Sequence, residues 1–291
     1  MQYNLPKVQG KYKFNARLKT WFDVGGNCEV IFAPANLEDL QFFLKNIDSG
    51  VALTIVGACS NVIVSDEGIK GVVIKLPAQF AKISHESDVI TAGAANLCGN
   101  VALYSKSCGL SGLEFFSGVP GSVGGAIAMN AGCYGGDTAQ RLISARALDF
   151  SGNIFELKNS DFGFFYRGSK ISKNFIFIDA SFKLDKSSSE EVGKKILELS
   201  KQRENAQPIR AKTGGSTFKN PAEKRAWELI DAAGCRGKII GDAQISEKHC
   251  NFMINRKNAT AQDLITLGEE VKRLVKEKCG VNLEWEIKIL K

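Results

Sequence analysis

The amino-acid sequence predicts an α+β chain with at least two lobes. Short runs rich in β-branched residues dominate the first part of the chain, and they have the length and composition of strands. The last third instead carries apolar residues at helical spacing. The composition changes at the serines 187–189, where we place the boundary between the lobes.

Strands are predicted first, in the runs CEVIFAP, ALTIVGACSNVIVSD, GVVIKL and DVITAGA. One helix interrupts them, because NLEDLQFFLKNI places its leucines on one face and Asn36 is a suitable N-cap. After a glycine tract at 117–136, SARALDFSGNIFEL predicts a hairpin that turns at Ser151–Gly152–Asn153. The run FIFIDASFKL predicts a further strand.

Three amphipathic helices are predicted in the last third, over about 189–205, 222–233 and 261–278. Gly234 and Gly280 lie where C-terminal caps usually fall. Thr260 and Asp263 suit the start of the last helix.

Composition argues against several classes of protein. No run of about eighteen apolar residues occurs, so we expect no membrane span, and the first residues contain no apolar signal core. The eight cysteines form no C-x-x-C pair, which favours reduced thiols in a cytoplasm. Two histidines make a zinc site improbable, so no metal is expected. The net charge of +7 fits nucleic acid or a phosphate-bearing ligand, but the basic residues are scattered.

Two glycine-rich segments are candidate phosphate-binding loops. The first is Gly57–Asn61, and the second, SGVPGSVGGAIAMNAGCYGG at 117–136, holds seven glycines in twenty residues. The sequence contains no Walker A loop and no clean G-x-G-x-x-G. Successive backbone N–H groups can bind phosphate without a lysine. For the first segment, it stays an open alternative that the glycines merely permit tight turns. This alternative is weaker for the second segment, because each of its many glycines costs about 0.5–1 kcal/mol on folding.

Three further segments carry polar side chains that could act in a site. In TGGSTFKNP, Ser216 either projects into a cleft or caps the next helix, a role that Asn220 suits better. In FFYRGS, Arg167 suits a carboxylate or phosphate, although an exposed arginine is the simpler interpretation. In LEWEIKIL, which alternates like a strand, Glu284 and Glu286 share a face that is either solvated or turned toward a site.

Taken in this order, the segments resemble the UDP-N-acetylenolpyruvoylglucosamine reductase (MurB) family of flavoenzymes, in its shorter type II branch. The similar phrases are TWFDVGGNCEV, VGACSNVIVSDEGIKGVVIKL, GLEFFSGVPGSVGGAIAMNAGCYG, FFYRGS, GGSTFKNP, ISEKHCNFMIN and LEWEIKIL. They run from about Lys19 to Ile289, nearly the whole chain.

The resemblance implies an FAD-binding fold of the vanillyl-alcohol-oxidase (PCMH) type, with two subdomains, followed by a C-terminal α+β substrate-binding domain. We therefore expect an FAD domain over 1–187, split near 76, and a substrate domain over 188–291 whose final strand carries a catalytic acid. The FAD pyrophosphate is expected to meet backbone N–H groups. The residues expected to bind the cofactor are Gly57, Ala58, Cys59, Ser60, Asn61, Gly118, Pro120, Gly121, Ser122, Gly124, Gly125, Asn130, Ala131 and Gly132.

The implied reaction reduces the enolpyruvyl ether of UDP-N-acetylglucosamine to UDP-N-acetylmuramate in peptidoglycan synthesis. NADPH is the implied co-substrate that reduces FAD. Arg167 matches the cation that stabilises the carboxylate as its charge grows. Ser216 matches the proton donor, and Glu286, which precedes an apolar–basic–apolar run, matches the acid that organises the carboxylate.

The resemblance implies substrate contacts from Tyr166, Arg203, Lys219, Asn220 and His249. The chain departs from the family pattern at two places. Ala206 lies where the family often has a lysine, so one of the expected contacts with the UDP diphosphate is in doubt. Arg210 or Lys212 could make that contact instead. Cys59 stands where the family usually has a second glycine, and we interpret it as a small packing residue.

The resulting expectation is a cytoplasmic monomer with small-molecule substrates, no nucleic-acid partner and no membrane association. Two alternatives stay open: another FAD oxidoreductase of the same fold acting on a different sugar or alcohol, and a non-catalytic nucleotide-binding relative. Intact candidates at Arg167, Ser216 and Glu286 argue against both.

Overall fold

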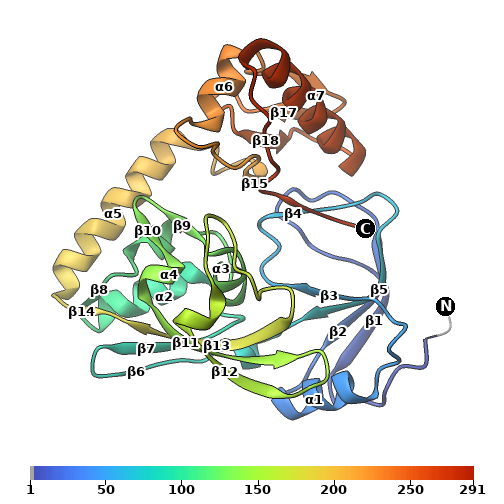
Figure 1. Cartoon of the computed structure of the whole chain (residues 1–291), viewed down its shortest axis with the longest axis vertical. Helices are drawn as coiled ribbons and strands as arrows, with labels where there is room; N and C mark the ends of the chain where they lie inside the picture. The colour runs from blue at the N-terminus through green and yellow to red at the C-terminus, as the bar shows by residue number, and fades with distance from the viewer. Residues whose placement is uncertain (1–2) are drawn as a thin grey trace. The chain divides into compact units, whose positions relative to one another are not determined.

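The computed structural model describes residues 3–291 (Figure 1). The chain divides into two compact units. The first unit contains the described residues of 1–14 together with 30–58 and 71–202. The second unit contains 15–29, 59–70 and 203–291. The boundary between the units crosses helix α5 (Ser189–Ala206) between Gln202 and Arg203. Two segments from the N-terminal part of the chain belong to the second unit.

A four-stranded sheet begins the chain, with the order β1-β2-β5-β3. The edge strand β3 runs parallel to its neighbour β5, and helix α1 packs its apolar face against the sheet. The predicted N-cap is confirmed, because the Asn36 side chain accepts a hydrogen bond from the Asp39 N–H. Phe43 of this helix lies 4.3 Å from Phe32 of the sheet between ring centroids, at the centre of a buried cluster. The elements are β1 Lys11–Arg17, β2 Asn27–Ala33, α1 Leu37–Asn46, β3 Leu53–Val56 and β5 Ile69–Lys75.

An antiparallel five-stranded sheet lies wholly within the first unit, in the order β12-β11-β13-β7-β6. The predicted hairpin is confirmed: β11 and β12 pair, and Gly152 between them has a φ of 79°. The strands are β6 Ile83–Glu86, β7 Val89–Gly93, β11 Leu142–Asp149, β12 Ile154–Lys158 and β13 Phe175–Lys183.

Short helices and two small strand pairs complete this unit. The apolar residues of most of them join the buried cluster of the five-stranded sheet, whereas Phe80 packs in the cluster of the four-stranded sheet. The helical elements are η1 Ala78–Phe80, α2 Cys98–Ser107, η2 Glu114–Gly118, α3 Val123–Met129, α4 Thr138–Arg141, η3 Asn159–Phe162 and the long α5 Ser189–Ala206. The paired strands are β8 Leu110–Ser111 with β14 Asp185–Lys186, and β9 Gly132–Cys133 with β10 Gly136–Asp137.

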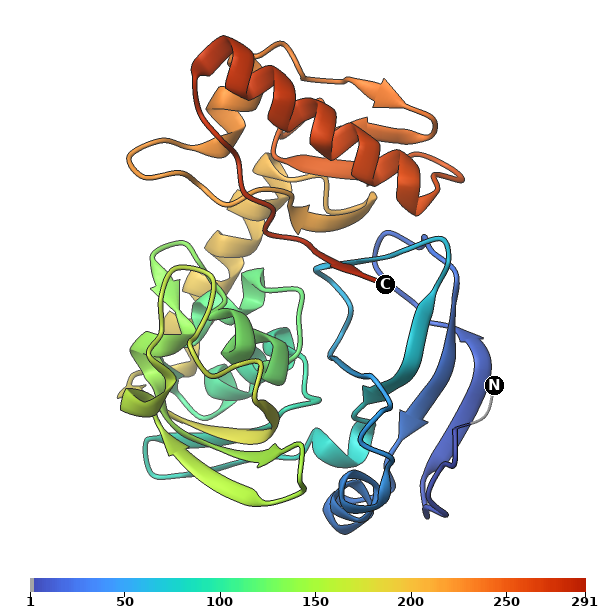
Figure 2. The same ribbon diagram turned by 45° about the vertical axis from the view of Figure 1, so that its right-hand side comes forward.

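The second unit is built on an antiparallel sheet in the order β15-β18-β17-β16. Helices α6 and α7 lie beside this sheet (Figure 2). They contribute to its buried cluster, as does Phe22 from the N-terminal part of the chain. A parallel pair joins β4 to the last strand, β19. The elements are β4 Val62–Val64, β15 Lys212–Ser216, α6 Ala226–Ala232, β16 Ile239–Ile240, β17 Ala243–Ile245, β18 Phe252–Asn255, α7 Ala261–Cys279 and β19 Lys288–Leu290.

Two predicted element boundaries in this unit are wrong. The helix expected from about 222 begins at Ala226, because the preceding residues form a turn closed by a bond from the Lys224 N–H to the Pro221 carbonyl. The strand expected over 283–290 is a regular strand only at Lys288–Leu290. The last helix is as predicted, since Thr260 and Asp263 form a capping box and Gly280 has a φ of 70°.

Candidate active site

The glycine tract turns into helix α3 next to the segment that follows β7. Ser122 is the N-cap of this helix, and its Oγ accepts a hydrogen bond from the Gly125 N–H. The N–H groups of Val123 and Gly124 donate to the carbonyls of Asn96 and Ala94. These bonds fix the backbone of the tract on the sheet of the first unit.

The first glycine-rich segment meets the second at Ser122. A Cβ on Gly57 would lie 2.3 Å from Ser122 Oγ, so the chain after β3 can approach the N-cap only without a side chain. The residues Gly57 and Ala58 of this segment therefore lie beside the start of α3, within the first unit.

Backbone donors remain available at this meeting point. The N–H groups of Gly121 and Ser122 have no acceptor among residues 3–291. A Cβ on Gly125 would meet only Ser122 Oγ, at 3.6 Å, so packing within the chain does not require glycine there. The FAD pyrophosphate is bound by backbone N–H groups that can approach it closely. The free N–H donors beside Gly125, which carries no side chain, fit this requirement.

Other glycines of the tract are explained by packing within the chain. A Cβ on Gly118 would lie 2.8 Å from Cys133 Sγ, and one on Gly132 would lie 2.4 Å from the Gly136 carbonyl oxygen. The Ala131 N–H donates to the Ala126 carbonyl. Pro120 lies in the short segment between η2 and α3. Their predicted contacts with FAD stay predictions.

Arg167 occupies a strained position in a tight turn of the first unit. The N–H of Phe165 donates to the Gly168 carbonyl and the N–H of Gly168 donates back, which leaves Tyr166 and Arg167 as the two central residues. Arg167 has a φ of 62°, where glycine is strongly preferred. Strain of this kind costs about 1–3 kcal/mol and concentrates at functional positions. The interpretation as an ordinary exposed arginine is therefore disfavoured.

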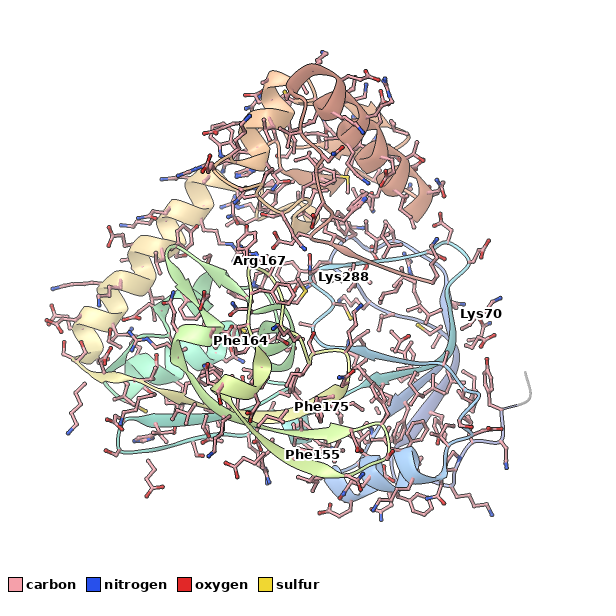
Figure 3. All side chains as sticks on the ribbon, in the orientation of Figure 1. Lys70, Phe155, Phe164, Arg167, Phe175 and Lys288 are labelled. Atoms are coloured by element: carbon pink, nitrogen blue, oxygen red, sulfur yellow. The ribbon has the colours of Figure 1, made fainter. Side chains whose placement is uncertain are left out.

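Two contacts hold this turn in place. Asn130, the left-handed C-cap of α3, donates from Nδ2 to the Phe165 carbonyl at 3.3 Å and accepts from the Ala139 N–H at 2.9 Å. The guanidinium of Arg167 lies 5.0 Å from the ring centroid of Tyr166. Figure 3 shows Arg167 on the loop that also carries Phe164, whose ring stacks on Phe162. Asn130 thus connects the end of the glycine tract to the Arg167 turn.

Ser216 ends strand β15 at an irregular point of the sheet. The register with β18 shifts between Thr213 and Ser216, where Gly214 and Gly215 intervene. A Cβ on Gly214 would lie 2.3 Å from the ring of Phe22, and Gly215 has a φ of 79°. The alternative that Ser216 caps a helix is wrong, because it belongs to a strand and α6 begins ten residues later.

Glu286 lies on the segment that pairs with the residue after Ser216. Its N–H donates to the Thr217 carbonyl at 2.9 Å. Asn61 forms two hydrogen bonds with the same segment. Its Nδ2 donates to the Glu286 carbonyl, and its backbone carbonyl accepts from the Lys288 N–H. Ser216 and Glu286 are therefore brought together on neighbouring segments of the second unit.

Glu284, the acid two residues before Glu286, has a different environment. The Glu284 side chain is 75% exposed and forms an ion pair with Lys219 at 3.2 Å. Glu286 is less exposed than Glu284, which supports it as the acid of a site. Cys59 and Ser60 precede Asn61 in the same loop, and Cys59 has a φ of 56°, which explains why a glycine would suit its position.

The remaining predicted substrate residues belong to the second unit. Arg203 donates to Gln207 Oε1 at 3.2 Å, and Asn220 Oδ1 accepts from the Ala226 N–H. His249 Nδ1 accepts from the Asn251 N–H, and burial lowers the pKa of His249. Arg167 and Tyr166, by contrast, belong to the first unit.

The sequence analysis missed Asn251, which supports the Ser216 segment. This buried side chain accepts from the Phe218 N–H at 2.9 Å and donates to the Phe218 carbonyl at 2.8 Å. Its carbonyl also accepts from the Thr217 N–H. The only signal was its place in the phrase ISEKHCNFMIN.

Comparison with known proteins identifies the class first. A family model described as FAD binding domain matches residues 28–158. Backbone N–H donors lie where the two glycine-rich segments come together. With these donors, the match defines an FAD-dependent oxidoreductase and confirms the predicted cofactor. A second model, described as the C-terminal domain of UDP-N-acetylenolpyruvoylglucosamine reductase, matches residues 207–290.

Full-length relatives identify the family. A protein of Anaplasma marginale (strain St. Maries) named UDP-N-acetylenolpyruvoylglucosamine reductase is 48% identical, covering 99% of this chain and 96% of the relative. A protein of the same name from Paramagnetospirillum magneticum is also 48% identical, covering 98% and 93%. The crystal structure of the MurB protein from Thermus caldophilus aligns with a TM-score of 0.83 at 30% identity, covering 98% of this chain and all of that one. The chain belongs to the UDP-N-acetylenolpyruvoylglucosamine reductase family, and the predicted fold class is confirmed.

Proposed function

We propose that this chain reduces UDP-N-acetylglucosamine enolpyruvate to UDP-N-acetylmuramate, with FAD as cofactor and NADPH as co-substrate, in peptidoglycan precursor synthesis. The observation that carries the proposal is the pairing of the Ser216 and Glu286 segments in a chain of this family, together with a strained arginine at 167. The bound flavin would supply the hydride that reaches the terminal enolpyruvyl carbon.

The residues of the chain would manage the charge and the proton. Hydride addition to an enolpyruvyl group places negative charge next to its carboxylate. The Arg167 guanidinium would bind that carboxylate and stabilise the charge. Ser216 Oγ–H would donate the proton to the adjacent carbon, and Glu286 would hold the carboxylate by sharing a proton with it, since two close carboxylates do not both stay ionised cheaply.

The substrate contacts and the organisation of the chain form part of this proposal. Tyr166, Arg203, Lys219, Asn220 and His249 would bind the UDP-sugar, and residues 188–291, with the two segments that join them, would form the substrate-binding domain. We further propose a cytoplasmic monomer that acts on small molecules without nucleic-acid or membrane partners. No helix among residues 3–291 combines the length and the apolar character needed to cross a bilayer.

A flavin spectrum tests the function directly. The purified protein is expected to be yellow, and its flavin absorbance is expected to bleach when NADPH is added and to return without oxygen when the enolpyruvyl substrate follows. A colourless protein that takes up no FAD contradicts the proposal. Bleaching without return on addition of the substrate favours another FAD oxidoreductase of the same fold.

Ser216→Ala separates the two halves of the reaction. Flavin reduction by NADPH is expected to stay near its normal rate, because the hydroxyl has no part in that step. Reoxidation by the enolpyruvyl substrate is expected to slow by about 10²–10⁴, the usual contribution of a positioned proton donor. Stopped-flow absorbance measures both rates, and equal loss in both would show that Ser216 is not mainly the proton donor.

A further inference from the structure

A cysteine, a histidine and a tyrosine form a contact cluster that has no role in the proposed reaction. His85 comes from the edge strand β6, Tyr104 from helix α2 and Cys108 from the C-cap of that helix, all within the first unit (Figure 1). His85 Nδ1 lies 3.1 Å from Tyr104 Oη and 3.5 Å from Cys108 Sγ. His85 is exposed and Cys108 is half-buried, so small molecules can reach the thiol.

The arrangement places a base beside the Cys108 thiol. With its proton on Nε2, the imidazole accepts at Nδ1 and can take the proton of the Cys108 thiol. An imidazole that removes the thiol proton during attack leaves a positive charge beside the sulfur, and neighbours of this kind are what activate cysteines. Desolvation and then the charge of Cys108 raise the pKa of Tyr104, which keeps its O–H available as a donor.

The other thiols of the described residues lie in different surroundings. Two are also half-buried, but the Cys133 thiol donates to the Phe115 carbonyl at 3.2 Å and the Cys279 thiol donates to the Leu229 carbonyl at 3.7 Å. A carbonyl acceptor favours the protonated form. The five remaining cysteines are buried, and burial raises the pKa of Cys28 and of Cys250 to about 11. Among the described residues, Cys108 is the cysteine in contact with an imidazole.

We propose that Cys108 is a modification site that reacts with organic disulfides, including oxidised low-molecular-weight thiols, with His85 as its base. Cys108 Sγ attacks one sulfur of the disulfide, a new S–S bond forms and the old one breaks. The thiol proton passes through His85 Nδ1 to the departing thiolate, so the products are a mixed disulfide at Cys108 and one free thiol. This inference is independent of the proposed function.

The test measures how fast the FAD-loaded enzyme reacts with 5,5′-dithiobis(2-nitrobenzoate) at neutral pH, with peptide mass spectrometry to locate the adduct. We expect a fast phase that releases one equivalent of the coloured 2-nitro-5-thiobenzoate thiolate and labels Cys108. Cys108→Ser is expected to abolish that phase. His85→Phe is expected to slow it by at least about tenfold, because the base is lost.

Matched variants keep the outcome decisive. Cys133→Ser and Cys279→Ser are expected to leave the fast phase unchanged, and Tyr104→Phe is expected to slow it less than His85→Phe. The flavin spectrum of each variant verifies that it is folded, and labelling of the unsubstituted enzyme needs no variant at all. First labelling at Cys133 or Cys279, or a rate within twofold of normal in a folded His85→Phe, overturns the proposal.

Discussion

At the scale of single residues, the backbone conformation of Arg167 is more informative than its charge. A side chain at a φ of 62° in a tight turn works against local stability, so the turn is expected to be retained for what the guanidinium does there. The sequence named the residue only through the family phrase FFYRGS, because one arginine in a loop carries no signal of its conformation.

Two substitutions at this residue separate strain from function. Arg167→Gly is expected to raise the thermal midpoint or leave it unchanged, since glycine accepts a positive φ, while turnover falls by about a hundredfold or more. Arg167→Lys keeps the charge and the strain but loses the planar fork, so turnover should fall as well. Thermal melting and steady-state rates measure both effects. Turnover within twofold of normal in Arg167→Gly would refute the role.

The Asn130 side chain is expected to act through this turn. Asn130→Gly keeps the left-handed backbone that the C-cap requires but removes the bonds to Phe165 and Ala139. We expect a turnover loss of about fivefold to thirtyfold, equivalent to 1–2 kcal/mol, with FAD still bound. Flavin content and turnover of the same preparation check this. Loss of FAD with normal turnover per flavin would show that Asn130 serves the cofactor instead.

At the scale of elements, sequence patterns predicted helices and strands well where capping or alternation is local. The capping box at Thr260 and the N-cap Asn36 were predicted correctly for that reason. The start of α6 was predicted too early because residues 222–225, which precede the helix, have helical composition. They instead form a turn in which the Lys224 N–H donates to the Pro221 carbonyl. The strand at 283–290 was predicted too long because apolar and charged residues alternate over the whole run, although Trp285 forms only an isolated bridge to Phe218.

The start of helix α3 gives a prediction at this scale. A Cβ on Gly124 would lie 3.0 Å from the Ala94 Cβ, whereas one on Gly125 meets open space apart from Ser122 Oγ. Gly125→Val is therefore expected to lower FAD affinity by about tenfold or more while the thermal midpoint without FAD changes little. Gly124→Val should lower both, because it also overpacks the sheet contact. Flavin titration and melting of the FAD-free protein measure this, and unchanged FAD affinity in Gly125→Val would remove the segment from the cofactor site.

At the scale of the whole molecule, the compact units are not consecutive in the sequence. The segments 15–29 and 59–70 belong to the second unit, together with 203–291. Composition indicated a boundary near 187, because composition records local changes and contains nothing about which distant segments share a core. The buried Phe22, Val24 and Ile63 all lie in the core of the second unit, and the sequence offered no means of assigning them there.

Because the second unit includes two N-terminal segments, we expect that residues 188–291 do not fold on their own. That fragment lacks Phe22, Val24 and Ile63, and each buried apolar side chain of this size contributes about 1–5 kcal/mol. It also lacks β4, the parallel partner of β19, and the Asp66 carboxylate that accepts hydrogen bonds from the N–H groups of Ala261 and Gln262. The combined loss is comparable with the usual net stability of a domain, about 5–15 kcal/mol.

Calorimetry of the isolated fragment is expected to show no cooperative unfolding transition. Mixing it with residues 1–187 should restore a transition, because that piece supplies both missing segments. A matched change in the full chain, Ile63→Ala, should lower stability by about 2–5 kcal/mol, whereas Lys70→Ala, at an exposed position of β5, should change it by less than about 0.5 kcal/mol. A sharp transition from 188–291 alone would show that the two N-terminal segments are only accessory to its core.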